Sequence, residues 1–282
     1  MADIPASLVV KLREMTNAGM MDCKKVLIET GGNLEAAVDL LRKRGVATAA
    51  KKATREAHEG VVAAAVLPGA RTGVLLEVNC ESDFVAKNEL FRAFADQIAK
   101  VLAENPEADL ESLRTDAVAR IRENIKIARF KRFEVAGNGL VAAYIHTGSK
   151  VGVLVEVGAG TEASVARDDF KQLVRDITLQ IAAANPVAVR QEDVDPAFIA
   201  KEREIIANSD LLKNKPPQAI ARIIEGKLDK FYKENCLLNQ GFVKRNGEIS
   251  VQEHIGGVAK QLGDEIVVRR FLRFQVGEAF TA

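Results

Sequence analysis

One polar corner stands out among the residues that could act on a partner molecule. The nearly continuous apolar run Val74-Leu-Leu-Glu-Val78 is followed by Asn79-Cys-Glu-Ser-Asp83 and then by Phe84. An apolar run bounded by turn-forming residues predicts a strand buried on both faces, with a turn from Asn79 to Asp83. Phe84 then arrives where the chain leaves the core. The corner either presents an acid and an aromatic ring to a partner protein or is a plain junction with Phe84 packed under the next helix, and composition alone favours the junction.

The residue types that usually build catalytic or metal sites do not gather in this sequence. Cys23, Cys80 and Cys236 are odd in number and far apart, so they fit neither a zinc site nor a disulfide framework. The three histidines have no cysteine or carboxylate at ligand spacing. There is no glycine-rich phosphate loop, no dinucleotide fingerprint and no nucleophile elbow. The sequence therefore predicts no catalytic residue, no metal and no cofactor.

Length, composition and charge describe an ordinary globular protein. The 282 residues are enough for two or three domains, and 48% of them are apolar and 28% charged. A formal net charge of +1 leaves no global electrostatic footprint, so we expect no stable nucleic-acid binding. No stretch approaches the roughly 18 apolar residues of a membrane span, and the first residues lack a signal-peptide pattern. We therefore expect a cytoplasmic protein without membrane contact.

The elements that would position a site begin with three short helices over residues 3–45. Asp3, Asp22 and Asn33 are suited to cap the first turns of these helices. Gly45 is expected to end the third helix, because glycine commonly follows the last helical turn.

The apolar residues of this region exceed what three short helices can enclose. Leu8, Leu12 and Met15 follow helical spacing on one face, and Met20 and Met21 are placed in the loop after the first helix. Leu12, Met20 and Met21 are more than so small a core can bury. Two interpretations remain open: the flexible methionines form a docking face, or they complete the core.

A basic segment follows the helices. Residues 41–55 contain six basic residues and no acid. The segment either contacts RNA or the ribosome or is a solvated helical linker, and the linker is the commoner meaning of such a charge run. It is predicted to close a first domain at residues 1–54.

An internal repeat organises the rest of the chain. Residues 60–78 match residues 139–157 without a gap, at an offset of 79 positions (139 − 60 = 79). Each copy contains two strand-like runs joined by a glycine-containing turn, which predicts a β-hairpin, and continues into a helix that ends at Asn-Pro. A third strand is predicted in each copy, because residues 123–135 match residues 264–276.

The repeat predicts an α+β fold. After the three-helix domain come two β-β-α-β modules, assigned to residues 55–138 and 139–282, each an antiparallel sheet covered on one face by helices. At the position of the polar corner the second copy has Val157-Gly-Ala-Gly-Thr-Glu162, without an Asp-Phe pair. The fold therefore does not require Asp83 and Phe84, and this difference favours a functional role for them.

The second copy carries an insertion of 62 residues, because its third strand is offset by 141 positions (264 − 123 = 141) instead of 79. Apolar residues at helical spacing flank a turn at Lys213-Asn-Lys-Pro-Pro217. The pattern predicts an antiparallel helical hairpin, resembling a coiled coil, at about residues 190–235. It is either a partner-docking arm or a decorative insertion, and the spacing does not decide between them.

Four segments, in order, resemble one known family. They are Thr16-Asn-Ala-Gly-Met-Met-Asp-Cys-Lys-Lys25 with Leu12-Arg13; Glu77-Val-Asn-Cys-Glu-Ser-Asp-Phe-Val-Ala86; Gly152-Val-Leu-Val-Glu156 with His146; and Cys236-Leu-Leu-Asn-Gln-Gly-Phe-Val-Lys244 with Arg273-Phe-Gln-Val-Gly277. Together they resemble the bacterial elongation factor Ts family over essentially the whole chain. The resemblance implies a guanine-nucleotide exchange factor for the translational GTPase elongation factor Tu, which works without a bond-breaking active site.

The resemblance also implies a role for the N-terminal region. Residues 1 to about 54 would form a three-helix domain of the ubiquitin-associated type that docks on the nucleotide domain of the GTPase. Arg13, Met20 and Met21 match the family's contacts there.

Further roles are implied for the corner and for the second hairpin. Ser82, Asp83, Phe84 and Val85 match the family's Thr-Asp-Phe-Val segment, which wedges into the GTPase and disturbs its Mg²⁺ site. His146 matches a contact to the far domain of the GTPase. This chain departs from the family pattern in having Ser82 in place of threonine. It also has Gly241 where proline is usual, and it stops soon after Gly277, where some relatives continue into a docking helix.

Overall fold

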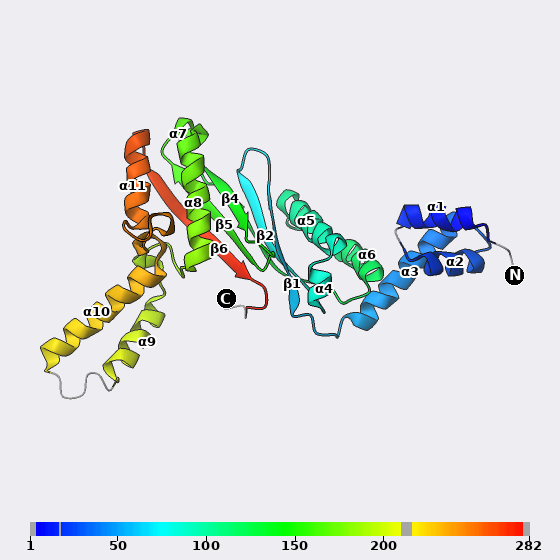
Figure 1. Ribbon diagram of the computed structural model, residues 1–282, viewed down its shortest axis with the longest axis horizontal. Coiled ribbons are helices and arrows are strands. Elements are labelled where there is room, and N and C mark those ends of the chain that lie inside the picture. The colour runs from blue at the N-terminus through cyan, green and yellow to red at the C-terminus, as the bar shows by residue number, and fades with distance from the viewer. Residues whose placement is uncertain (1–3, 17, 210–215, 279–282) are drawn as a thin grey trace.

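The computed structural model describes residues 4–16, 18–209 and 216–278. A helical bundle lies at one end of an elongated molecule, two β-sheets with their helices form the middle, and a helical hairpin projects at the other end (Figure 1). The predicted cap at Asp3 and most of the predicted turn at 213–217 lie outside the described residues.

The N-terminal bundle consists of α1 (Ala6–Thr16), α2 (Met20–Glu29) and α3 (Leu34–Lys52). Asn33 caps α3 as expected, because its side chain accepts a hydrogen bond from the backbone N–H of Ala36. The placement of the two methionines in a loop is wrong, since α2 begins at Met20 and Gly19 is its N-cap residue in place of Asp22.

The prediction that α3 ends at Gly45 is also wrong, because the helix continues to Lys52. Gly45 lies where α3 crosses α6 (Glu111–Ile121), and a Cβ added there would lie 3.4 Å from the Cβ of Ala119. Ala49, one turn later, is buried against the first module. Small residues thus let α3 pack closely on α6, and that packing extends the helix beyond its expected end. The basic segment of residues 41–55 is therefore largely helical, as the linker interpretation predicts, but one face of it is buried against α6 and the first module.

Both copies of the repeat fold into a three-stranded antiparallel sheet. The first contains β1 (Glu59–Val66), β2 (Thr72–Cys80) and β3 (Lys126–Glu134), and the second contains β4 (Gly139–Ile145), β5 (Val151–Ala159) and β6 (Ile266–Gln275). The middle strands are β2 and β5. Even the irregularities repeat, since β2 and β5 each shift register after their glutamate, at Glu77 and Glu156. The predicted α+β class and the repeated sheets are confirmed.

Helices cover one face of each sheet (Figure 1). In the first module α5 (Glu89–Glu104) packs on β1 and β2, and α6 packs on α5. In the second module the helices are α7 (Glu162–Ala166), α8 (Asp168–Ala184) and α11 (Val251–Leu262). The largest buried rings are Phe91 on α5 and Phe170 on α8, which occupy matching positions. Leu90 has the helical spacing of a core residue with Phe94 and Ile98, but it is exposed, because Phe91 occupies the core position.

The other faces of the two sheets pack against each other, which the sequence did not predict. Val62, Leu75, Val141 and Leu154 contribute to this shared apolar layer. The two sheets also exchange matching hydrogen bonds, from the Val62 N–H to the Ser149 carbonyl and from the Val141 N–H to the Ala70 carbonyl, both at 2.7 Å.

Matching glycines make this close approach possible. A Cβ added to Gly73 would lie 2.6 Å from Cγ1 of Val141, and one added to Gly152 would lie 2.5 Å from Cγ1 of Val62. Either distance is too short for packed carbon atoms, so a side chain at these positions would push the sheets apart.

Two buried carboxylates reinforce the contact in a nearly two-fold symmetric way. Arg129 donates to Glu77 at 2.7 Å and to a backbone carbonyl of the second module, while Arg270 donates to Glu156 at 2.8 Å and to a backbone carbonyl of the first. Burial alone would raise the pKa of Glu156, but hydrogen bonds from Arg269, Arg270 and a backbone N–H outweigh it and the pKa is lowered. The two modules are therefore joined by paired charges as well as by apolar packing.

The insertion forms the predicted pair of helices, α9 (Pro196–Ala207) and α10 (Pro217–Asn235), at the far end of the molecule (Figure 1). The Phe198 and Phe231 rings pack at a tilt of 37° with centroids 5.5 Å apart, and Arg203 pairs with Glu225 at 2.8 Å. The loop that follows α10 packs into the second module through Leu237 and other buried residues. Among the described helices, none is both long and apolar enough to cross a membrane.

Candidate functional site

The corner between β2 and the short helix α4 (Asp83–Ala86) presents Phe84 to solvent. Ser82 caps α4, because its Oγ accepts a hydrogen bond from the Val85 N–H at 3.3 Å. Val85 and Ala86 anchor the turn in the first core, while the Phe84 side chain is 81% exposed. The interpretation that Phe84 packs under the next helix is therefore wrong.

The acid beside Phe84 is held in its charged form. Lys87 Nζ donates a hydrogen bond to Asp83 Oδ2 at 2.7 Å, and this bond lowers the pKa of the Asp83 carboxyl. Asp83 and Phe84 thus place a negative charge next to an exposed aromatic ring, on a single helical turn.

A residue that sequence reasoning missed holds this corner in place. Glu123 Oε2 accepts hydrogen bonds from the N–H groups of Glu81 and Ser82, both at 3.0 Å, and Glu123 Oε1 accepts one from Ser82 Oγ at 2.6 Å. Nothing local marks Glu123, but the repeat offers a signal, since Asp264 occupies the matching place before the third strand of the second copy.

The second copy builds the same corner between β5 and α7. Thr161 caps α7 by accepting from the Ser164 N–H at 3.3 Å, and Asp264 accepts from the Thr161 N–H at 2.9 Å and from its hydroxyl at 2.8 Å. Ala163 stands in the place of Phe84 and is exposed. The chain thus builds one kind of corner twice and gives only the first an aromatic side chain.

The predicted N-terminal contacts are exposed on the bundle. Arg13 lies on the exposed side of α1, and Met20 and Met21 are 41% and 63% exposed in the first turn of α2. The interpretation that the methionines complete the core is therefore wrong. Leu12 was expected to be one of the apolar residues that the small core cannot bury, but it is fully buried. Met15, which was expected to face the core, is exposed.

His146 lies in the turn between β4 and β5, as predicted, and is exposed. Its Nδ1 is 3.0 Å from the hydroxyl of Tyr144, which fixes the direction of the ring. A mainly apolar cavity of about 330 Å³ adjoins both side chains and is lined also by Leu179 and Phe242. The predicted site residues therefore occupy three separate places: the bundle, the corner from Ser82 to Val85, and the turn of the second hairpin.

The basic segment is largely engaged within the chain. Arg42 donates to Ser112, Arg44 pairs with Glu29, Lys52 donates to the Arg122 carbonyl and Arg55 pairs with Glu81. The two ion pairs offset two of the six positive charges of this segment, whereas Arg42 and Lys52 donate to neutral groups and keep their charge.

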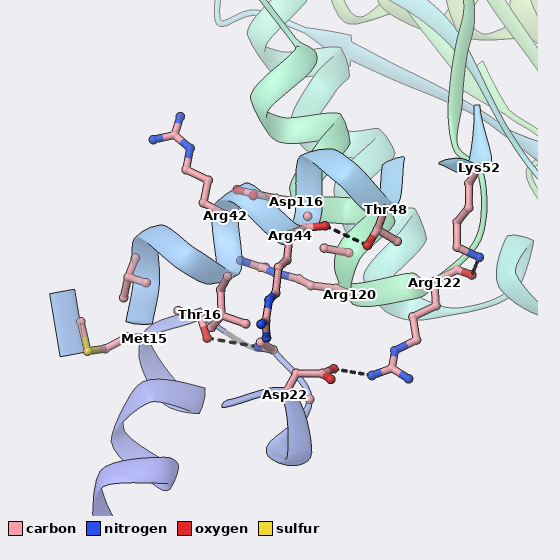
Figure 2. Close-up of a pocket in the computed structure, with 16 residues that line it drawn as sticks. Met15, Thr16, Asp22, Arg42, Arg44, Thr48, Lys52, Asp116, Arg120 and Arg122 are labelled. Carbon is pink, nitrogen blue, oxygen red and sulfur yellow. Dashed lines mark hydrogen bonds and ion pairs between the residues drawn. The ribbon is translucent and has the colours of Figure 1, made fainter. Parts of the chain in front are cut away.

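A cavity of about 540 Å³ lies between the bundle and α6 (Figure 2). Asp22 and Arg122 form an ion pair at its edge. Arg122 ends α6 in the left-handed conformation, with φ of 66°, which is costly for a residue with a side chain. Its carbonyl accepts from Lys52 at 2.7 Å, so this one residue contacts both α2 and α3.

The three cysteines are buried and free. Burial raises the pKa of the Cys80 thiol to about 12, so it is not a nucleophile at neutral pH. Within the described part of the chain, no group of three or more His, Cys, Asp or Glu side chains is placed to hold a metal ion.

The fold and the corner define an α+β protein whose candidate site is an exposed surface instead of an enclosed pocket. A family model described as Elongation factor TS matches residues 81–278. The chain is 45% identical over 285 residues to elongation factor Ts of Symbiobacterium thermophilum. The aligned region covers 99% of this chain and 93% of that relative. The chain is 42% identical over 278 residues to elongation factor Ts of Nitratidesulfovibrio vulgaris, and this alignment covers 98% of this chain and 96% of the relative. The chain belongs to the elongation factor Ts family.

Proposed function

We propose that this protein is the guanine-nucleotide exchange factor for elongation factor Tu in the bacterial cytoplasm. It binds the GDP complex of the GTPase, disturbs the Mg²⁺ and phosphate site, and promotes GDP release during translation elongation. Asp83 and Phe84, supported by Ser82 and Val85, act at the Mg²⁺ site. The observation that carries the proposal is the exposure of Phe84 on a corner whose repeat copy has only alanine.

The remaining contacts hold the GTPase along the length of the molecule. We assign Arg13, Met20 and Met21 to the nucleotide domain of the partner and His146 to its far domain. In this proposal residues 1–54 act as a docking domain of the ubiquitin-associated type, and residues 55–138 and 139–282 act as the two halves of a rigid core. The buried Glu77 and Glu156 pairs support such rigidity.

Energetics explain why a long factor is needed. Nucleotide binding in the nanomolar range corresponds to about 12 kcal/mol. Burying one phenylalanine contributes roughly 1.5–3 kcal/mol, which is about one to two decades in rate if fully expressed in the transition state of release. Phe84 alone is therefore insufficient, and the other contacts must hold the partner in the distorted, nucleotide-free shape.

No bond is broken in this cycle, so the factor acts through differential binding. The coupling is reciprocal: if the factor weakens GDP binding by some ratio, GDP weakens binding of the factor by the same ratio. Fresh nucleotide then displaces the factor and completes the cycle.

Stopped-flow release of a fluorescent GDP from elongation factor Tu tests the proposal. We expect the observed release rate to rise with the concentration of this protein and to saturate. The same titration with excess unlabelled nucleotide alone gives the uncatalysed rate. Equal rates with and without the protein would overturn the proposed function.

A further inference from the structure

Glu123 occupies a junction of three parts of the chain. It follows Arg122, whose left-handed backbone turns the chain from α6 towards the corner. Its carboxylate accepts three hydrogen bonds from the corner, at 3.0, 3.0 and 2.6 Å. The next residue, Asn124, donates its N–H to Glu81 at 2.6 Å and its side-chain amide to the Arg55 carbonyl at 2.7 Å. The corner is thus tied to the start of β3 by several bonds, and Glu123 makes most of them.

The corner depends on these bonds because its own elements are short. Helix α4 has only four residues, fewer than an isolated helix needs to be stable. The N–H groups of Glu81 and Ser82 lie outside the sheet ladder, so they need an acceptor, and the Glu123 carboxylate supplies one.

Phe84 has little packing of its own to fix its direction. Its side chain is 81% exposed, so the backbone of α4 decides where the ring points. That backbone is set at its first residue by Ser82, whose hydroxyl donates to Glu123 and accepts from Val85. A chain of contacts therefore runs from Glu123 through Ser82 to Phe84.

We propose that Glu123 is a positioning residue for nucleotide exchange, which keeps Phe84 pre-organised for insertion into the GTPase. This inference rests on the proposed function. A ring held in the bound direction loses less conformational entropy on insertion than one on a mobile loop. Glu123 does not touch the partner in this proposal, so it affects the rate of release at saturation more than the affinity for the GTPase.

The repeat provides a matched control. Asp264 makes the equivalent bonds to Thr161, at the corner where Ala163 replaces Phe84. The substitutions Glu123→Gln and Asp264→Asn each replace a carboxylate by an amide beneath a capping hydroxyl. Only the first lies beneath an exposed aromatic side chain.

The experiment measures release of fluorescent GDP from elongation factor Tu as a function of factor concentration. The proteins compared are the wild type, Glu123→Gln, Asp264→Asn, Phe84→Ala and the double variant Glu123→Gln/Phe84→Ala. We expect Glu123→Gln to lower the saturating rate about 5- to 20-fold and to change the half-saturating concentration less than twofold. Asp264→Asn should retain the wild-type rate. The double variant should be no slower than Phe84→Ala, because Glu123 acts through that ring.

If the wild type accelerates release, two outcomes would overturn the role of Glu123. One is a wild-type saturating rate for Glu123→Gln. The other is a double variant whose saturating rate is lowered by the product of the two single-variant reductions. A wild type that does not accelerate release would overturn the proposed function itself. If Glu123→Gln does not fold, as judged by circular dichroism, Glu123→Asp gives the decision, since its shorter side chain withdraws the carboxylate from Ser82 and keeps the charge. A two- to fivefold lower saturating rate then supports the proposal, and an unchanged rate contradicts it.

Discussion

The two strand-to-helix corners of the repeat have the same construction and different surfaces. Ser82 and Thr161 cap their short helices in the same way, and Glu123 and Asp264 accept hydrogen bonds from those caps. The first corner adds an exposed Phe84, whereas the second has only Ala163. The construction is thus a requirement of the fold, and the aromatic side chain is an addition to it. The comparison separates what stabilises the chain from what acts on a partner.

The largest expected effect comes from making the first corner like the second. Phe84→Ala should slow factor-promoted GDP release about 10- to 100-fold, because the lost ring burial is worth roughly 1.5–3 kcal/mol. The melting temperature should not change, since the side chain is already exposed. Stopped-flow release and thermal unfolding measure the two effects. Leu90→Ala, which removes another exposed apolar side chain nearby in the sequence, is the control and should leave release unchanged. A similar loss in both variants would contradict a special role for Phe84.

A smaller effect is expected at the hairpin turns, where His146 in the second copy matches Leu67 in the first. Leu67 packs against the first core, whereas His146 is exposed beside Tyr144. His146→Ala should weaken binding to elongation factor Tu roughly fivefold, about 1 kcal/mol, with little change in the saturating release rate. Calorimetric titration against the nucleotide-free GTPase measures the affinity. Thr147→Ala is the neighbouring control. A lower saturating rate with normal affinity would assign His146 to the release step.

The third difference concerns the residue that ends the helix before each third strand. Arg122 and Gly263 share a left-handed backbone, with φ of 66° and 67°. Arg122→Gly relieves backbone strain of roughly 1–2 kcal/mol, but it loses a surface ion pair worth about 0–1 kcal/mol and adds glycine flexibility costing about 0.5–1 kcal/mol. We therefore expect the free energy of unfolding in urea to change by less than about 1 kcal/mol.

The affinity for elongation factor Tu should nevertheless fall about twofold in Arg122→Gly, because the ion pair with Asp22 ties the bundle to the core. Calorimetric titration measures this affinity. Asp22→Asn should have the same effect on affinity. A difference between the two variants would show that the ion pair is not the cause.

The smallest effect concerns the pH dependence of the second corner. Hydrogen bonds from the side chains of Ser164 and Thr161 lower the pKa of Asp264 to about 2. A carboxyl with a lowered folded pKa stabilises the chain above its unfolded value, near 3.8, and this contribution is lost as pH falls towards 2. The carboxyl ¹³C shift of Asp264 should titrate near pH 2 by NMR. Thr161→Val removes one donor and should move the titration upwards, and an unchanged midpoint would exclude that bond as a cause.

Much of this fold follows from local patterns. The repeated strands, the glycine turns and the helices ending at Asn-Pro are all encoded within short segments, because alternation and turn residues act locally. The exposure of Phe84 could be inferred only indirectly, from its absence in the second copy. The sequence marks Glu123 only by its match to Asp264, and its role was missed because its partners Glu81 and Ser82 lie about 40 residues earlier and only the folded chain brings them together.

The errors share a physical origin. Gly45 was expected to end a helix, but its contact with Ala119 on α6 makes glycine the residue that fits there. Leu90 and Met15 have the spacing of core residues, yet neighbouring side chains take the space in the packed core and leave both exposed. Propensity and spacing specify which faces are available for burial, and packing decides which of them is used.

By itself, the sequence determined the α+β class, the two copies of the sheet, the inserted helices and the position of the polar corner. Those properties depend on periodicity and on turn chemistry, which need no distant partner. Only the tertiary structure decided that the sheets pack face to face through Gly73 and Gly152, that Glu123 secures the corner, and that Phe84 remains in solvent. Each of these depends on contacts between segments far apart in the chain, because close packing and hydrogen-bond satisfaction are settled only when the whole chain is folded.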